Sequence, residues 1–270
     1  MPSALELANA VLTAGTASTK VAAAKRLTES WAAGVEIGSV IETLCDNPSR
    51  PDRPVLIDPR HAKRRRLGTE AGRAALLHAV AHIEFNAIDL AADMLSRFCL
   101  DLRIDEGARH DFCSDWISVC ADEARHFELV EARMAEMGIF YGDYPAHNGL
   151  WEAALATKDN FAARLAIAPL VLEARGLDVT PAMIEKLEAQ KDYKSANVLK
   201  TIYEEEVRHV AIGRKWFKKV SQYAPKTEVS QFHDLVNRYF KGNLKPPFNH
   251  AARTKADLPP EFYMPLTTKS

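Results

Sequence analysis

The segments Asp122-Glu123-Ala124-Arg125-His126 and Glu205-Glu206-Val207-Arg208-His209 repeat one pattern, an acid followed by Glu-x-Arg-His. In each copy a Glu and a His stand three residues apart. On an α-helix this spacing is a rotation of roughly 300°, so the two side chains lie on one face, one turn apart. Of the nine histidines in the chain, these two alone have a Glu three residues earlier. Two such pairs in matching context predict two helices that each direct two metal ligands at a common point.

A bundle that binds two metal ions in this way also needs one carboxylate from each of two further helices. Glu84 lies inside the apolar stripe of one predicted helix, and Glu173 lies inside the stripe of another. Each is an acid where the spacing predicts a leucine, and each precedes one of the two motifs. The chain therefore contains two copies of a half-site. It predicts two helical hairpins that supply six metal ligands, Glu84, Glu123, His126, Glu173, Glu206 and His209.

The ligand types indicate which metals fit this site. Four carboxylates and two imidazoles are mostly hard oxygen donors with some nitrogen, a set that suits iron or manganese, whereas structural zinc sites are usually rich in thiolates. The alternative is that each Glu is a surface residue in an ion pair. It fits poorly, because all four lie on apolar stripes and an unpaired ionised group in a core is costly. We expect two iron ions as cofactor, with manganese or a mixed pair as alternatives.

The residues that flank the ligands predict a second layer. Asp122 and Glu205 each precede a ligand Glu. A histidine that binds a metal donates its other ring N–H to a carboxylate or carbonyl, which fixes its tautomer. We expect each acid to bind a ligand histidine, that of the opposite motif, and Arg125 and Arg208 to pair with these acids. For the two arginines, a solvated charge pair without a functional role fits equally well.

The rest of the chain is divided by its helix signals and prolines. We predict a helical extension and Pro-rich connector over residues 1–68, a metal-binding four-helix bundle over 69–222, and a helix with an extended tail over 223–270. The extension is expected to hold two helices within 3–44. Thr157 is predicted to cap the third bundle helix, and Pro169 to kink it beside Glu173. The other helices are expected near 69–98, 106–137, 180–190, 195–220 and 227–240.

Composition limits the classes of partner. At 270 residues and 47% hydrophobic, the chain has enough apolar material for one large domain or a core domain with extensions. A net charge of −1 does not indicate a nucleic-acid or membrane partner for the molecule as a whole. No apolar run approaches the length of a membrane span. The four cysteines form no C-x-x-C pair, and no signal peptide is evident, so we expect reduced thiols in a cytoplasmic protein.

One local charge cluster is an exception, the basic run 63–66 within His61-Ala62-Lys63-Arg64-Arg65-Arg66. Such a run can bind phosphates of RNA or of a nucleotide. It can also be a solvated segment that leads into the next helix, and we favour this second interpretation.

The motifs resemble those of known proteins. The acid-Glu-x-Arg-His doublet is similar to that of the soluble di-iron oxygenases of the ferritin-like superfamily. A closer resemblance, from about residue 60 to the Leu244–Asn249 tail, is to an uncharacterised bacterial family of ferritin-like proteins. It rests on four segments, His82–Ala91, Glu123–Phe127, Leu172–Pro181 and Arg208–Gly213. The resemblance implies an all-α fold, a ferritin-like four-helix bundle with additional N-terminal and C-terminal helices. A more distant relative is the di-iron hydroxylase of modified tRNA.

Three functions are compatible with such a site. We favour an O2-activating oxidoreductase of the hydroxylase or monooxygenase type, acting on a small molecule or a modified RNA. The alternatives are a ferroxidase or iron-binding protein and a peroxide-detoxifying protein. A cage-forming ferritin normally needs a much shorter chain, and the C-x-x-C site of a rubrerythrin is absent. No nicotinamide or flavin fingerprint is present, so an oxygenase would need a separate reductase. The sequence leaves a homodimer open.

Overall fold

The protein is all-α. The computed structural model describes residues 2–41, 44–58 and 66–267, and these form helices and no strand, with one isolated bridge between Leu56 and Ala146. The helices are, in order, α1 Ala4–Thr13, α2 Ala17–Ala32, α3 Glu70–Phe98, α4 Glu106–Glu136, α5 Gly149–Ala156, α6 Phe161–Ile167, the π-helix η2 Ala168–Glu173, α7 Ala174–Ala189, α8 Tyr193–Ser221, α9 Glu228–Tyr239, α10 His250–Lys255, α11 Pro260–Tyr263 and the 3₁₀-helix η3 Met264–Thr267.

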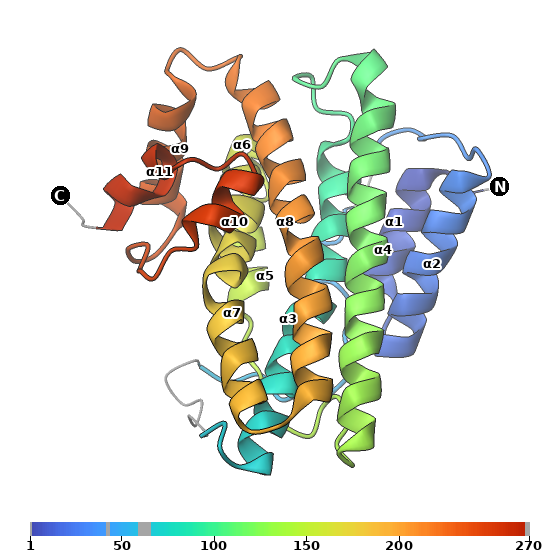
Figure 1. Ribbon diagram of the computed structural model, residues 1–270. Helices are drawn as coiled ribbons and strands as arrows, with labels where there is room; N and C mark the ends of the chain where they lie inside the picture. The colour runs from blue at the N-terminus through green and yellow to red at the C-terminus, as the bar shows by residue number, and fades with distance from the viewer. Residues whose placement is uncertain (1, 42–43, 59–65, 268–270) are drawn as a thin grey trace.

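Four long rods make up the centre of the molecule (Figure 1). Helices α3 and α4 form one hairpin, α6–η2–α7 and α8 form the other, and α4 lies beside α8. Helices α1 and α2 pack against α3 and α4, whereas α9 and α10 pack against α6, α7 and α8. The two terminal segments therefore flank the bundle on opposite sides (Figure 1). Among the described residues, no helix is both long and apolar enough to cross a membrane.

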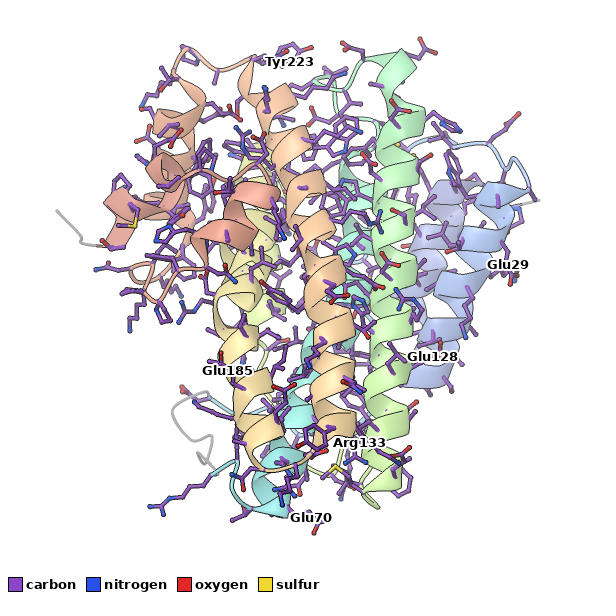
Figure 2. All side chains as sticks on the ribbon, in the orientation of Figure 1. Glu29, Glu70, Glu128, Arg133, Glu185 and Tyr223 are labelled. Carbon is purple, nitrogen blue, oxygen red and sulfur yellow. The ribbon has the colours of Figure 1, made fainter. Side chains whose placement is uncertain are left out.

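The ends of the long helices follow from local sequence. Thr69 caps α3, because its hydroxyl accepts the backbone N–H of Gly72. Gly138 follows the C-terminus of α4 with a φ of +71°, a left-handed conformation that glycine adopts without a steric penalty. Side chains on the outer faces, such as Glu128 and Glu185, point away from the bundle (Figure 2). The bounds expected for the first, second and fourth bundle helices agree with the structure within two residues.

The third rod differs from the expectation at its start. Thr157 does not cap it, since Thr157 ends α5 and Asn160 caps α6 by accepting the N–H of Ala163. The Thr157 hydroxyl instead donates to the carbonyl of Ala153 and accepts from Arg164 Nε. The long crossover before it contains the short helix α5. A Thr near the start of an apolar run can serve either helix end, and here a buried arginine is its partner.

The distortion expected at Pro169 is a π-helix, η2, which ends at Glu173. Proline lacks the N–H that an α-helix uses at this point, and π-turns often occur at functional sites. Gly213 of α8 faces this segment. A Cβ at position 213 would lie 2.3 Å from Pro169 Cβ, so only glycine allows η2 to approach α8 so closely.

The expected helix start at Thr180-Pro181 is wrong, because α7 runs through Pro181 without a break. Pro181 cannot donate to the carbonyl of Leu177, one turn earlier. The side-chain amide of Asn249 in the C-terminal tail donates to that carbonyl instead, at 3.2 Å. The tail is not extended either, because it forms α10, α11 and η3. At the other end of the chain, α2 ends at Ala32, earlier than expected. In the basic run, Lys63, Arg64 and Arg65 lie outside the described residues.

Candidate metal centre

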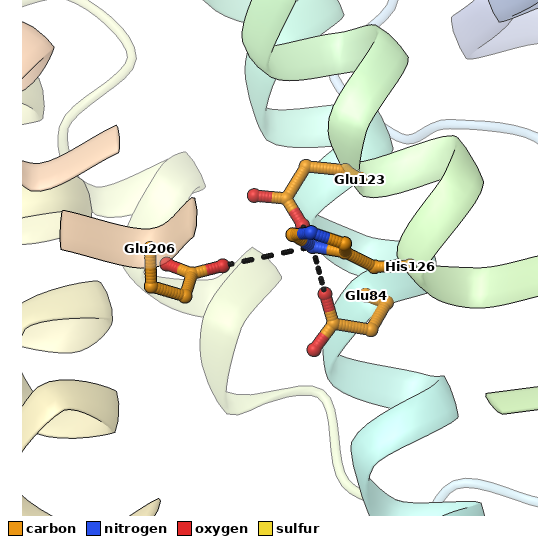
Figure 3. A group of neighbouring side chains, drawn as sticks. All are labelled: Glu84, Glu123, His126 and Glu206. Carbon is orange, nitrogen blue, oxygen red and sulfur yellow. Dashed lines mark hydrogen bonds and ion pairs between the residues drawn. The ribbon is translucent and has the colours of Figure 1, made fainter. Parts of the chain in front are cut away.

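Three helices bring four of the six predicted ligands into one group. Glu84 comes from α3, Glu123 and His126 from α4, and Glu206 from α8, and one ligand atom of each lies within 4.8 Å of the others. Figure 3 shows these side chains pointing toward one another. His126 Nδ1 lies 3.2 Å from Glu84 Oε2, 3.4 Å from Glu123 Oε2 and 3.9 Å from Glu206 Oε1. The group could hold a metal ion.

The other two predicted ligands adjoin this group. His209 Nδ1 lies 2.9 Å from Glu123 Oε1 and 3.4 Å from Glu206 Oε1, and the two imidazole rings are 5.8 Å apart. Glu173, the last residue of η2, interacts electrostatically with Glu206, Glu123 and His209. His209 thus lies in contact with the group, and Glu173 is close enough to interact with it electrostatically.

Most of these groups are deeply buried. Glu84 is 4% exposed, Glu123 1%, and both histidines 0%, whereas Glu173 and Glu206 are half-buried. The surface alternative for Glu84 and Glu123 is therefore wrong. Helical spacing places them on the inward faces of α3 and α4, where their ion pairs within the described residues are with His126 and His209.

Burial and mutual repulsion set the pKa values of the carboxylates. Burial raises the pKa of Glu84 and of Glu173 well above the usual range, and neighbouring carboxylates add to the shift. Burial also raises the pKa of Glu206, together with the charge of Glu123. For Glu123 burial acts in the same direction, but His209 and His126 outweigh it and lower the pKa. Ionisation of Glu84, Glu173 and Glu206 is therefore disfavoured in this interior.

The two imidazoles respond in the opposite sense. Burial lowers the pKa of His126, yet its contacts with Glu123 and Glu84 overcome this effect and raise the pKa to about 11. Burial likewise lowers the pKa of His209, while the charges of Glu206 and Glu123 raise it well above the usual value. The region therefore favours positive charge strongly.

Unsatisfied atoms test whether a metal fits. Both carboxylate oxygens of Glu123, Oε2 of Glu173 and Nδ1 of His209 are buried without a hydrogen bond of good geometry. Such atoms are rare in native proteins, since each costs about 1–3 kcal/mol or more. Carboxylate oxygens and imidazole nitrogens are also the donors that divalent first-row metals take. The residues present fit a metal centre.

A second layer connects the two motifs. His126 Nε2 lies 2.6 Å from Glu205 Oε2, and His209 Nε2 lies 3.1 Å from Asp122 Oδ2. Each acid thus binds the histidine of the opposite motif. Both histidines keep Nδ1 directed at the ligand carboxylates, because Nε2 is hydrogen-bonded to Glu205 or Asp122 on the outer side.

The two motif arginines lie over these acids. Arg125 donates to Asp122 Oδ1 at 3.1 Å and also to Glu205, and Arg208 donates to Asp122. Burial raises the pKa of Asp122, but the hydrogen bonds from His209 and Arg208 outweigh it and hold the pKa well below the usual range. Glu205 also has a lowered pKa, because Arg125 and His126 outweigh its burial. Both acids are therefore ionised at neutral pH.

Two other histidines of α3 form hydrogen bonds with the crossover after α4. His82 Nδ1 lies 2.8 Å from the hydroxyl of Tyr141, and His78 Nε2 accepts the N–H of Gly142 at 2.9 Å. Burial lowers the pKa of each to about 4, so both are neutral at pH 7. They lie on a different face of the helix from Glu84 and take no part in the group of ligands.

Sequence reasoning missed the contribution of the C-terminal tail. Asn249 Nδ2 donates to the hydroxyl of Tyr203 at 2.8 Å, and the Asn249 N–H donates to Asp178 Oδ1 at 2.9 Å. Tyr203 lies one turn before Glu206 on α8. The tail therefore braces α7 and α8 beside the candidate metal centre. The one available signal was Pro181, whose missing N–H leaves a carbonyl that needs another donor.

Comparison with known proteins gives a family but no activity. An uncharacterised protein of Haemophilus influenzae is 40% identical over 206 residues, which cover 76% of this chain and 72% of that protein. No solved structure matches the chain. A family model described as "Protein of unknown function (DUF455)" matches residues 13–264. The resemblance to an uncharacterised bacterial family therefore holds, although neither description names a fold or a metal, and the chain belongs to the DUF455 family.

Proposed function

We propose that the protein binds two metal ions, iron or manganese, in a ferritin-like bundle, and that it is an O2-activating oxidoreductase of the hydroxylase type. The observation that carries the proposal is the buried group of Glu84, Glu123, His126 and Glu206, with His209 next to it, in which several buried atoms lack a hydrogen-bond partner. A pair of divalent cations would satisfy these atoms and offset the charge of the carboxylates.

On this proposal the ligands would divide between two metal ions. Glu123 lies between the two imidazoles, with Oε2 facing His126 and Oε1 facing His209. Glu206 Oε1 also contacts both rings, whereas Glu84 contacts His126. Glu123 and Glu206 would therefore each help to hold both ions. The remaining carboxylate, Glu173, would complete the position next to His209.

When bound, reduced iron or manganese would supply electrons for the reduction of O2, and O2 would be the oxidant of the substrate. The chain's own residues keep the site dry and orient the ligands. Glu205 and Asp122 hold the outer N–H of the two histidines, which fixes the tautomer that directs Nδ1 inward. A duplicated site within one chain, flanked by long terminal segments, favours an enzyme over an iron-storing shell.

Metal analysis and oxygen kinetics test this function together. We expect about two iron or manganese ions per chain, and O2 consumption within seconds when dithionite-reduced protein is mixed with O2 in a stopped-flow instrument. Protein stripped with a chelator is the control, and it should consume no O2. One zinc per chain would contradict the metal assignment. Consumption of peroxide without O2 uptake, or hundreds of iron ions per oligomer, would instead indicate a detoxifying or iron-storing protein.

The second layer makes a separate prediction. Glu205→Gln and Asp122→Asn should each weaken metal binding about 10- to 100-fold, because an amide does not hold the imidazole N–H as a carboxylate does. Competition with a chromogenic chelator measures the affinity. Glu204→Gln, at an exposed neighbouring position, should leave the affinity unchanged. Equal affinities in Glu205→Gln, Asp122→Asn and the unaltered protein would show that these acids do not orient ligands.

A further inference from the structure

A pocket of about 310 Å³ lies on the outer side of η2, between the start of α7 and the C-terminal segment. Val171 and Leu172 form one wall, and residues 240–245, which follow α9, form the other. Figure 1 shows the C-terminal segment alongside α7 at this level. The size is at the lower end of the range for small-molecule sites, which runs from about 300 to 1,000 Å³.

The walls of the pocket are mostly apolar, but its rim is cationic. The side chains of Lys241 and Lys245 are exposed and form no ion pair or hydrogen bond within the described part of the chain. Arg175 Nη1 donates to the carbonyl of Lys245 at 2.6 Å and to that of Pro247 at 3.0 Å, which holds the rim in place. The pocket has one carboxylate, Asp178, and its charge is already engaged. The uncompensated charge of the pocket is therefore positive.

Arg253 supplies a second, independent observation. It lines the same pocket and is 2% exposed, with two hydrogen bonds to Asp178 at 2.7 and 2.8 Å. Its Nη1 is buried and has no hydrogen-bond acceptor. The guanidinium also stacks over the rings of Phe248 and Tyr263. A buried charged donor without an acceptor is costly, and an anionic ligand would remove that cost.

We propose that this pocket binds an amphipathic organic anion, a monocarboxylate with a short hydrocarbon chain. The carboxylate would lie among Lys241, Lys245 and Arg253, and the hydrocarbon chain would lie against Val171 and Leu172. A polyphosphate fits less well, because the walls are apolar and the volume is small. The assignment does not depend on the metal centre, although η2 joins the two sites through Glu173.

Octanoate is the probe for this site. Calorimetric titration of the full-length protein should show saturable binding of octanoate. Octanol, which lacks the charge, and acetate, which lacks the hydrocarbon chain, should each bind with an affinity at least tenfold lower. In a methyl-labelled protein, octanoate should shift the resonances of Val171, Leu172 and Leu244 first. Octanol binding as tight as octanoate, or shifts confined to other methyl groups, would overturn the proposal.

Charge variants complete the test without disturbing the buried Arg253–Asp178 pair. Lys241→Met/Lys245→Met should lower the affinity for octanoate at least tenfold. Lys186→Met/Lys218→Met is the matched control, because both lysines are exposed, lie outside the pocket and form no ion pair within the described residues. Equal octanoate affinity in the two double variants would refute the assignment. Metal content, measured on the same samples, should be the same in both, so that failure at this pocket is distinguishable from failure of the metal proposal.

Discussion

Glu123→Ala should reduce the metal content from about two ions per chain to less than one tenth of that value. Glu123 has one oxygen facing each imidazole and is 1% exposed, so on the proposed function its removal would take a donor from both metal ions at once. No neighbouring side chain can replace it, because the adjacent carboxylates already face the same region. Elemental analysis of the purified variant, after addition of excess iron(II) and desalting, measures the effect.

The control for this variant lies on the same helix. Glu128→Ala removes a carboxylate whose side chain is 42% exposed and paired with Lys25, on the outside of α4 (Figure 2). It should keep the full metal content. His209→Ala provides a second test from α8 and should also lose metal. Unchanged metal content in Glu123→Ala or in His209→Ala would contradict the assignment, provided circular dichroism shows that the variant is folded.

Lys20→Met should destabilise the protein by about 3 to 5 kcal/mol, the typical result of leaving a buried charge without its partner. Lys20 Nζ of α2 lies 2.5 Å from Asp89 Oδ1 of α3 and 2.9 Å from the carbonyl of Val11 in α1, and both charged side chains are 0% exposed. Among the described residues, Arg50 is the one other cation paired with Asp89, at 3.5 Å. The pair joins the N-terminal hairpin to the bundle. Urea denaturation measures the loss of free energy of unfolding.

Two further measurements separate the unpaired charge from lost packing. Lys20→Met/Asp89→Leu removes both members of the fully buried pair. Arg50, which also loses Asp89, is partly exposed and keeps its hydrogen bond to Asn86 at 2.7 Å, so most of the lost stability should return. Burial already raises the pKa of Asp89 to about 6, with Lys20 and Arg50 opposing the shift, and removal of Lys20 raises it further. The deficit of Lys20→Met is therefore fully present only above the further raised pKa that Asp89 has in the variant. It should shrink as the pH falls from there toward 6, and it should stay constant below pH 6, where Asp89 is protonated with or without Lys20. A deficit independent of pH, with no recovery in the double variant, would assign the effect to packing.

The sequence was sufficient for the parts of the fold that local periodicity determines. The starts of α3 at Thr69 and of α9 at Thr227 follow from capping residues, and the end of α4 follows from Gly138. The convergence of the two Glu-x-x-His pairs follows from helical spacing, since it needs only that the two helices pack on their apolar faces. The π-helix arises where Pro169 removes a backbone donor.

The remainder depends on contacts between distant segments. Asp89 and Asp93 are buried acids on the same helix as Glu84, and sequence alone does not show why they are not ligands. The structure shows that each has a cation of its own, Lys20 for Asp89 and Arg164 for Asp93. Pro181 was misinterpreted for a similar reason, because the donor that compensates for it lies in the tail.

The crossed hydrogen bonds between the motifs have a consequence for assembly. Because the carboxylate that orients each imidazole comes from the opposite hairpin, a fragment with only one hairpin would contain a motif but no group to fix its tautomer. On the proposed function, tight metal uptake must then follow docking of the two halves during folding. Only chains with a complete tertiary structure would then hold the two metal ions, and partly folded chains would be left without redox-active metal.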